Sequence, residues 1–290
     1  MNRDESLRQL REARVWDVLV IGGGATGLGA ALDAATRGYR TALVEQSDFA
    51  KATSSRSTKL IHGGVRYLRQ GNLSLVRGAL HERTRLLANA PNLVHPLAFV
   101  IPSGSLAQTL FYGAGLKLYD LLAGRHGLSA SQILSKEEVL ARAPTLGSTH
   151  LRGGLLYFDA QFDDSRLAIA LAQTFAENGG ALLNYARVVA LRKSSGKICG
   201  ALVHDEESGA EIELTARVVV NATGVFCDSL RKLDEPKADV SVTPSQGAHL
   251  VLPKRFLPGE TAILLPSTSD GRVLFAIPWH DRVLLGTTDI

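Results

Sequence analysis

The pattern of apolar and polar residues divides the first part of the chain into a strand, a helix and a second strand. The run from Val18 to Ile21 is entirely apolar, which is typical of a strand that is buried on both faces of a parallel sheet. Small and apolar residues then recur at helical spacing from Ala25 to Arg37, and Gly38 follows as a C-terminal stop. The apolar segment from Thr41 to Glu45 predicts a second strand. We therefore predict a βαβ unit in this part of the chain.

Beyond this unit, helical and strand-like patterns alternate less regularly. A polar helix is predicted before the first strand, and "SKEEVLARAP" predicts a short helix with Ser135 as N-cap and Glu138 in a capping box. Further helices are predicted over 74–89, 106–122 and 163–180. Strands are predicted over 91–103, 181–191, 198–204 and 211–220, followed by several short ones after Val240.

Composition narrows the class of protein. The chain has 290 residues, of which 45% are hydrophobic and 21% charged, as in a soluble globular protein with a sizeable core. Its net charge of +4 suits an anionic substrate better than nucleic acid, which usually requires a denser basic stripe. Cys199 and Cys227 form no CxxC pair and lie near no ligand-spaced histidine. Neither a disulfide framework nor a metal site is therefore predicted.

Two stretches bear on targeting and membranes. The N-terminal residues are charged throughout and lack the apolar core of a signal peptide. The stretch from Leu86 to Leu116 contains no Asp, Glu, Lys or Arg and is long enough to span a bilayer. However, Pro91, Pro96 and Pro102 interrupt it, and prolines at this spacing break a helix. We predict no transmembrane helix here, and we favour a buried strand and loop over a membrane-docking surface.

The turn after the first strand is a candidate dinucleotide site. Gly22, Gly24 and Gly27 satisfy GxGxxG, which combines a tight turn, a close backbone approach to pyrophosphate and a helix N-terminus with free N–H groups. Glu45 ends the second strand, where a carboxylate accepts hydrogen bonds from an adenosine ribose and repels a 2′-phosphate. This pattern predicts a dinucleotide cofactor but does not distinguish FAD from NAD.

Two further segments add to this site. The apolar strand "VVVNATG" ends in small residues, including Ala222 and Gly224, which let the backbone pass close to a bulky cofactor. The segment "SSRSTKLIHGGVRYL" contains arginine, lysine and histidine side chains but no carboxylate. Such uncompensated charge beside two glycines raises the question of which group supplies the counter-charge.

Taken in order, these segments resemble those of the FAD-dependent glycerol-3-phosphate dehydrogenases, within the D-amino-acid-oxidase-like flavoproteins. The resemblance also rests on "YFDAQFDDSRL", "SQGAHLVLP" and "LFAIPW…LLGTTD", and it extends from about Val15 to Ile290. It implies an α/β (mixed α+β) fold with a Rossmann-like FAD-binding domain and a second, β-sheet-containing substrate domain. We expect the FAD domain to be discontinuous, over 15–75 and 155–230, and the substrate (cap) domain to cover 76–154 and 231–290.

The resemblance also assigns roles to residues. The basic segment would run past the flavin and face the substrate phosphate, so that two phosphate-bearing molecules supply its counter-charge. His249 would lie in the substrate site, although a lone histidine at the start of a strand is more often structural. His62, beside two glycines, would contact the flavin rather than act as a base. Arg66 and Tyr67 would be on the substrate side, and the cofactor side would comprise Thr53, Ser54, Ser55, Lys59, His62, Gly63 and Gly64.

The implied reaction is the oxidation of sn-glycerol 3-phosphate to dihydroxyacetone phosphate. His249 would take the C2 hydroxyl proton while hydride moves to flavin N5, and Arg66 would clamp the phosphate. Electrons would pass to quinone, with the protein bound peripherally to the cytoplasmic face of the cell membrane and a homodimer as one oligomeric option. Because the chain stops within a predicted strand, we interpret it as a C-terminally truncated fragment. Two alternatives stay open: another flavin oxidase or dehydrogenase of the superfamily, or an inactive fragment that does not retain FAD.

Overall fold

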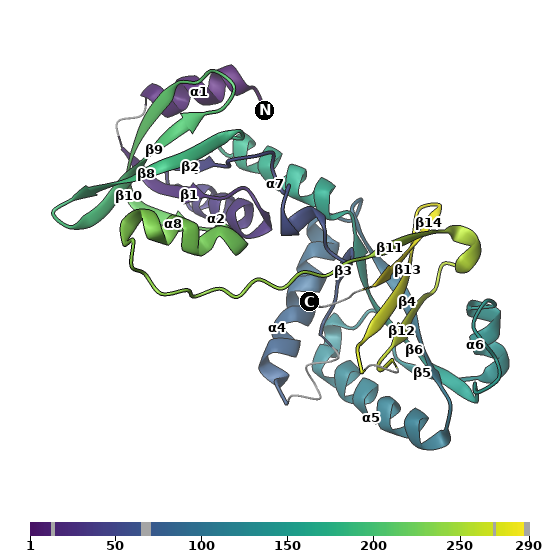
Figure 1. The fold of residues 1–290 in the computed structure, drawn as a ribbon. Helices are drawn as coiled ribbons and strands as arrows, with labels where there is room; N and C mark the ends of the chain where they lie inside the picture. Colours follow the sequence, from purple (N-terminus) through teal and green to yellow (C-terminus); the bar gives the residue numbers. More distant parts are fainter. Residues whose placement is uncertain (13–14, 65–70, 269–270, 287–290) are drawn as a thin grey trace. The chain divides into compact units, whose positions relative to one another are not determined.

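The chain folds into two compact units, each built from two separate stretches of sequence (Figure 1). The computed structural model describes residues 1–12, 15–64, 71–268 and 271–286. The first unit comprises Met1–Ser57 and Asp164–Pro244, and the second comprises Thr58–Asp163 and Ser245–Ile290. The sequence analysis placed the changes of domain near residues 75, 155 and 230. In the structure they come at other residues, because 60–61 and 153–162 are strands of the second sheet.

The first unit contains a six-stranded sheet with parallel strands at its centre. Its strands are, in order, β7 (Ala181–Leu183), β2 (Thr41–Val44), β1 (Trp16–Ile21), β10 (Glu211–Asn221), β9 (Lys197–Asp205) and β8 (Ala186–Ser194). β7, β2, β1 and β10 run parallel, whereas β9 and β8 continue from β10 in antiparallel pairs. The predicted βαβ unit is thus formed by β1, α2 (Ala25–Thr36) and β2.

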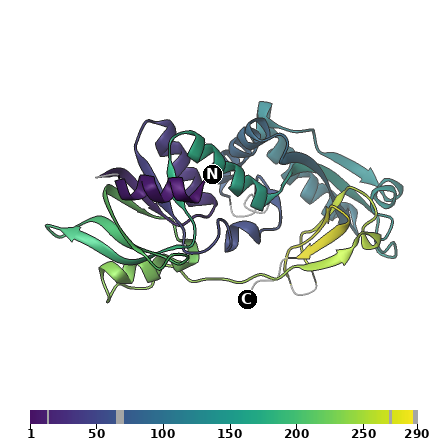
Figure 2. The same cartoon turned by 90° about the horizontal axis from the view of Figure 1, so that it is seen from above.

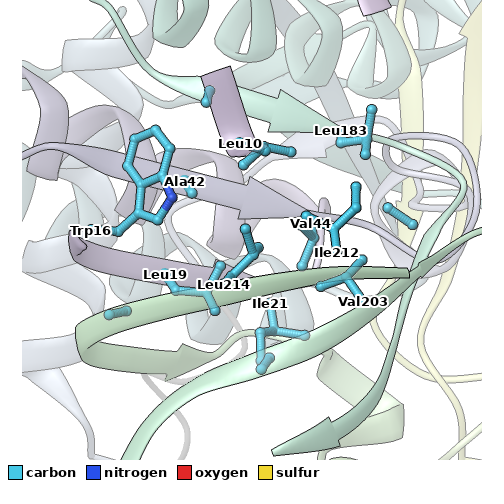
Figure 3. Packing of buried hydrophobic residues seen from close by; sticks show 14 of the residues in the cluster. Leu10, Trp16, Leu19, Ile21, Ala42, Val44, Leu183, Val203, Ile212 and Leu214 are labelled. Carbon is cyan, nitrogen blue, oxygen red and sulfur yellow. The ribbon is translucent and has the colours of Figure 1, made fainter. Parts of the chain in front are cut away.

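Both faces of the parallel strands are covered, which explains why β1 is apolar at successive positions. On one face Val20 packs in a cluster with residues of α2 and α7 (Asp164–Glu177). On the other face Leu19 and Ile21 pack in a cluster with Val203 of β9, Leu214 of β10 and Leu10 of α1 (Arg3–Glu12) (Figure 3). Successive side chains of a strand point to opposite faces, so an uninterrupted apolar run is needed to fill both clusters.

The single strand predicted over 181–191 is wrong, because this range contains two strands that lie at opposite edges of the same sheet. β7 ends at Leu183 and β8 begins at Ala186. Between them Tyr185 has a φ of 50°, a left-handed conformation that an extended strand does not allow. The Tyr185 N–H donates to the carbonyl of Ser47 at 2.9 Å, and this bond helps to hold the break between the two strands. β7 pairs with β2, whereas β8 pairs with β9, and the pattern of residue types does not show this change of pairing strand.

The second unit contains an eight-stranded sheet in which one long strand, β6, pairs with three others. The strands are β3 (Leu60–Ile61), β4 (Val94–Ser103), β5 (Gln132–Ser135), β6 (Gly153–Phe162), β11 (Leu250–Pro253), β12 (Ala262–Leu265), β13 (Leu274–Trp279) and β14 (Arg282–Gly286). β6 pairs antiparallel with β3, β4 and β5, and β4 pairs in parallel with β12. The C-terminal strands, drawn in yellow, lie together in both views (Figures 1 and 2).

Helices cover the second sheet and confirm most of the helical predictions. α4 (Leu73–Asn89) and α5 (Leu106–Ala123) end within a residue of the expected positions. α6 (Lys136–Arg142) carries the predicted capping box, with both the Ser135 and the Glu138 hydrogen bonds present. Phe99 of β4, Leu116 of α5 and Tyr157 of β6 pack in one buried cluster. Neither β6 nor α8 (Cys227–Asp234) was predicted from the pattern.

Candidate functional site

The glycine-rich turn joins β1 to α2, and two of its glycines leave no space for a side chain. Gly22 has a φ of 113°, and a Cβ built on it would lie 2.4 Å from the carbonyl oxygen of Ala222. A Cβ on Gly27 would lie 1.9 Å from the carbonyl oxygen of Gly22. The turn that follows β10 therefore passes directly against the turn that follows β1. The structure thus brings together the predicted residues Gly22, Gly27 and Ala222.

The N-terminus of α2 opens onto this turn. Gly24 is the N-cap and provides no side-chain cap. Instead, the Ala25 N–H donates to Ser54 Oγ at 2.9 Å, so that a serine of the basic segment lies beside the first turn of the helix. Ser54 belongs to a short 3-10 helix, Thr53–Ser55, which also contains the predicted residues Thr53 and Ser55. A helix N-terminus with adjacent hydroxyl groups is a favourable place for a phosphate.

Glu45 directly follows β2, and its side chain contacts the glycine-rich turn. Its Oε2 accepts the Gly23 N–H at 2.7 Å, and its Oε1 accepts the Ser47 N–H at 2.8 Å. These two bonds fix the carboxylate in place while each oxygen retains a further lone pair. The carboxylate therefore retains capacity to accept a hydrogen bond from a ribose hydroxyl, which stays a prediction for this position. Gly224 begins the 3-10 helix Gly224–Phe226, with a φ of 57°.

Ser57 and Asp164 hold the basic segment to α7, and the sequence analysis missed both. The Ser57 N–H and Oγ donate to Asp164 Oδ2 at 3.2 and 2.8 Å. Asp164 is buried at the first turn of α7, within the "YFDAQFDDSRL" motif. A serine within the basic segment and a carboxylate at a helix start were the only signals of this pairing.

In the second unit, the basic segment continues through β3 to Gly64. Lys59 has a φ of 60°, an uncommon conformation for a residue with a side chain, and its carbonyl accepts the Phe162 N–H at 3.1 Å. Gly63 and Gly64 are buried, whereas His62 is exposed. The predicted substrate-side residues Arg66 and Tyr67 lie outside the described residues.

His249 lies just before β11 and contacts the start of the same segment. Its Nε2 is 3.1 Å from Thr58 Oγ1, and its ring packs so closely on Gly286 that a Cβ there would be 2.7 Å from His249 Cδ2. Burial lowers the pKa of His249 below its usual 6.5, and the charge of Lys59 lowers it further. The imidazole is therefore neutral at neutral pH, the form that accepts a proton. Thr58 and Gly286 are residues that the sequence analysis did not single out.

The turn, the helix N-terminus and the acidic residue at the end of the second strand define a dinucleotide-binding protein. A family profile described as "FAD dependent oxidoreductase" matches residues 17–290. The chain belongs to this family of FAD-dependent oxidoreductases, which confirms the predicted family resemblance, fold class and cofactor.

Individual relatives and structures make the similarity more specific. The chain is 46% identical to the mitochondrial glycerol-3-phosphate dehydrogenase of Mesocricetus auratus and 45% identical to that of Homo sapiens. Each alignment covers 99% of the chain. It spans 41% of the length of these relatives. A crystal structure of glycerol-3-phosphate dehydrogenase from Bacillus halodurans complexed with FAD is 33% identical and aligns with a TM-score of 0.79, covering 99% of this chain and 50% of that one.

The residues present fit FAD. The turn around Gly22 and Gly27 admits no side chain, the α2 N-terminus faces it, and Glu45 has acceptor capacity for a ribose. These features lie in the first unit, whereas Lys59, His62, Gly63 and Gly64 lie in the second. Cys199 and Cys227 are free thiols. Within the described ranges, no cluster of three metal-ligating side chains is present, and no helix is long and apolar enough to cross a membrane.

Proposed function

We propose that the protein is an FAD-dependent glycerol-3-phosphate dehydrogenase that oxidises sn-glycerol 3-phosphate to dihydroxyacetone phosphate. The observation that carries this proposal is the identity of 46% with a protein of that name across 99% of the chain. The motifs of the two units agree with it, because the first unit suits a dinucleotide and the second presents a neutral histidine.

His249 is the proposed base. When its Nε2–H donates to Thr58 Oγ1, Nδ1 carries the lone pair that accepts the proton of the substrate C2 hydroxyl. The contact with Gly286 restricts the ring to one orientation. The lowered pKa keeps this lone pair available at neutral pH. FAD, when bound, supplies the two-electron acceptor for the hydride that leaves C2, for which we propose flavin N5.

Arg66 is the proposed clamp for the substrate phosphate, with Tyr67 beside it. A guanidinium presents a planar fork of donors that matches two phosphate oxygens. The absence of any carboxylate between Ser54 and Leu68 supports this role, because no side chain of the segment competes for the positive charge.

We also propose quinone as the electron acceptor and a peripheral position on the inner face of the cell membrane. β4 is the buried strand expected for part of the uncharged stretch, but α5, which begins at Leu106, exposes large apolar side chains. These are Leu106, Leu110, Phe111, Leu118 and Leu121, which are 38% to 76% exposed. An exposed apolar stripe on a helix supports contact with the interface of a bilayer. A homodimer remains one option for the oligomeric state.

An absorbance spectrum of the purified full-length protein tests the proposal. We expect flavin bands that lose intensity when sn-glycerol 3-phosphate is added without oxygen. The enantiomer, sn-glycerol 1-phosphate, and glycerol are matched controls and should leave the bands unchanged. Bands that bleach with an amino acid but not with glycerol 3-phosphate would assign a different substrate within the same family and overturn the proposal.

A further inference from the structure

The second unit contains a fully buried ion pair that the site described above does not use. Arg83 of α4 and Asp159 of β6 are each 1% exposed, and Arg83 Nη1 donates to Asp159 Oδ1 at 2.9 Å. Removing two charges from water costs several kcal/mol per ion, and their attraction offsets this only when further hydrogen bonds satisfy both groups. A buried ion pair therefore does not by itself indicate a stabilising role. The other hydrogen-bond partners of Arg83 and Asp159 indicate which part of the structure the pair positions.

The remaining partners connect the pair to the glycines of the basic segment. Asp159 accepts the backbone N–H of Gly63 at 3.2 Å on both of its oxygens. Tyr119 of α5 donates its hydroxyl to Asp159 Oδ2 at 3.1 Å. Arg83 Nη2 donates to the carbonyl of His126 at 3.0 Å. One buried carboxylate thus joins α4, α5 and β6 to the His62–Gly64 segment.

Neighbouring side chains also pack tightly against the backbone of Gly63. A Cβ on Gly63 would lie 2.2 Å from the Tyr119 hydroxyl and 2.6 Å from Leu80 Cδ2. Because the peptide is planar and trans, an N–H directed at Asp159 turns the His62 carbonyl the opposite way. The next residue, Gly64, has a φ of 73°, which glycine adopts without strain. The orientation of the His62–Gly63 peptide is therefore fixed from the buried side.

We propose that Arg83, Asp159 and Tyr119 are positioning residues that hold the His62–Gly63 peptide in the orientation needed for this segment to bind FAD. This inference rests on the proposed function, in which His62, Gly63 and Gly64 lie on the cofactor side. The three side chains act through the backbone of Gly63 and are separate from the residues that touch the cofactor. Burial raises the pKa of Tyr119, so its hydroxyl keeps the proton that it donates to Asp159.

The experiment separates positioning from simple stabilisation. In the full-length protein, the double variant Arg83→Met/Asp159→Leu replaces the pair with apolar groups of similar size, which proteins often tolerate. It leaves the Gly63 N–H without its acceptor. We expect the apoprotein to stay folded, with a melting temperature lowered modestly by the unsatisfied donors, but FAD binding that is weaker by about tenfold or more, as for the loss of a charge-assisted hydrogen bond. The dissociation constant is measured from the quenching of flavin fluorescence.

Two further variants keep the test decisive. Arg85→Met makes the same change two residues away on α4, at an exposed ion pair with Glu82, and should alter neither quantity. Tyr119→Phe preserves the ring and removes only the hydroxyl, so it should fold and bind FAD several-fold more weakly.

Wild-type FAD affinity in the double variant would overturn the inference, and so would wild-type affinity in Tyr119→Phe if the double variant does not fold. A wild-type protein that binds no FAD would instead remove the proposed function.

Discussion

Replacing Gly27 with alanine should destabilise the protein, although the same change two residues later should stabilise it. Gly27 and Gly29 both lie in the first turns of α2. Alanine is favoured over glycine inside a helix by about 0.8–1 kcal/mol. At Gly29 an added Cβ would meet nothing within 4 Å, so Gly29→Ala should gain about this amount. It serves as the matched control.

At Gly27 the steric term outweighs the gain in helix propensity. The new Cβ would lie 1.9 Å from the Gly22 carbonyl oxygen, whereas an ordinary contact begins at 3.4 Å, so the helix or the turn must retreat by about 1.5 Å. The two nearest atoms, the carbonyl oxygen and carbon of Gly22, belong to the backbone and cannot rotate away. The third, Ala222 Cβ, would lie 3.3 Å from the new Cβ. Overpacking of this kind costs about 1–3 kcal/mol. We expect Gly27→Ala to lose a net 1–2 kcal/mol or so, together with most of its FAD, because the turn moves away from the pyrophosphate position.

Urea denaturation of the two apoproteins and the flavin content after purification measure these effects. The reasoning fails if Gly27→Ala is as stable as Gly29→Ala and retains stoichiometric FAD. That result would mean that α2 does not approach the turn as closely as the structure shows.

Three further predictions concern the substrate site and the surface. His249→Asn should lower kcat by about 10²- to 10⁴-fold. In the wild type, the acid limb that His249 contributes to the kcat/KM–pH profile should lie below pH 6.5, because the pKa of His249 in the free protein is lowered. The absence of such a limb in His249→Asn would confirm its origin, and an unchanged profile would exclude His249. Arg66→Ala should lower kcat/KM for glycerol 3-phosphate by about 10- to 150-fold, mainly through KM, and spare glycerol; equal losses would contradict the phosphate role. Phe111→Ser should weaken co-sedimentation with anionic vesicles by about tenfold, whereas Ser at Ile133, which is similarly exposed on β5, should not; equal losses would contradict docking through α5.

Features that depend on neighbours in the sequence were predicted well. The βαβ unit, its glycine-rich turn and the acidic residue at the end of β2 follow from an apolar run, a helical period and three spaced glycines. The capping box of α6 was also predicted with its two residues, because both partners lie within one turn of the helix. Local geometry and residue type determine such features, so one sequence is enough to find them.

Features that depend on distant partners were decided only by the tertiary structure. Thr58 and His249 are 191 residues apart, and Arg83 and Asp159 are 76 apart. The sequence contains one hint, since Arg83 continues the buried positions Val76 and Leu80 of α4 and so places a charge on an apolar stripe. It does not show which carboxylate compensates that charge.

The same limit applies to the strands. β6 is held in the second sheet by its pairing with β3, β4 and β5, whereas its own sequence contains two glycines and an aspartate that weaken a strand signal. The break between β7 and β8 at Tyr185 likewise involves the carbonyl of Ser47, which is distant in sequence. Periodicity reports which faces of an element are buried. The partner that buries each face is chosen by packing and hydrogen bonding across the whole fold, and only the folded chain contains that information.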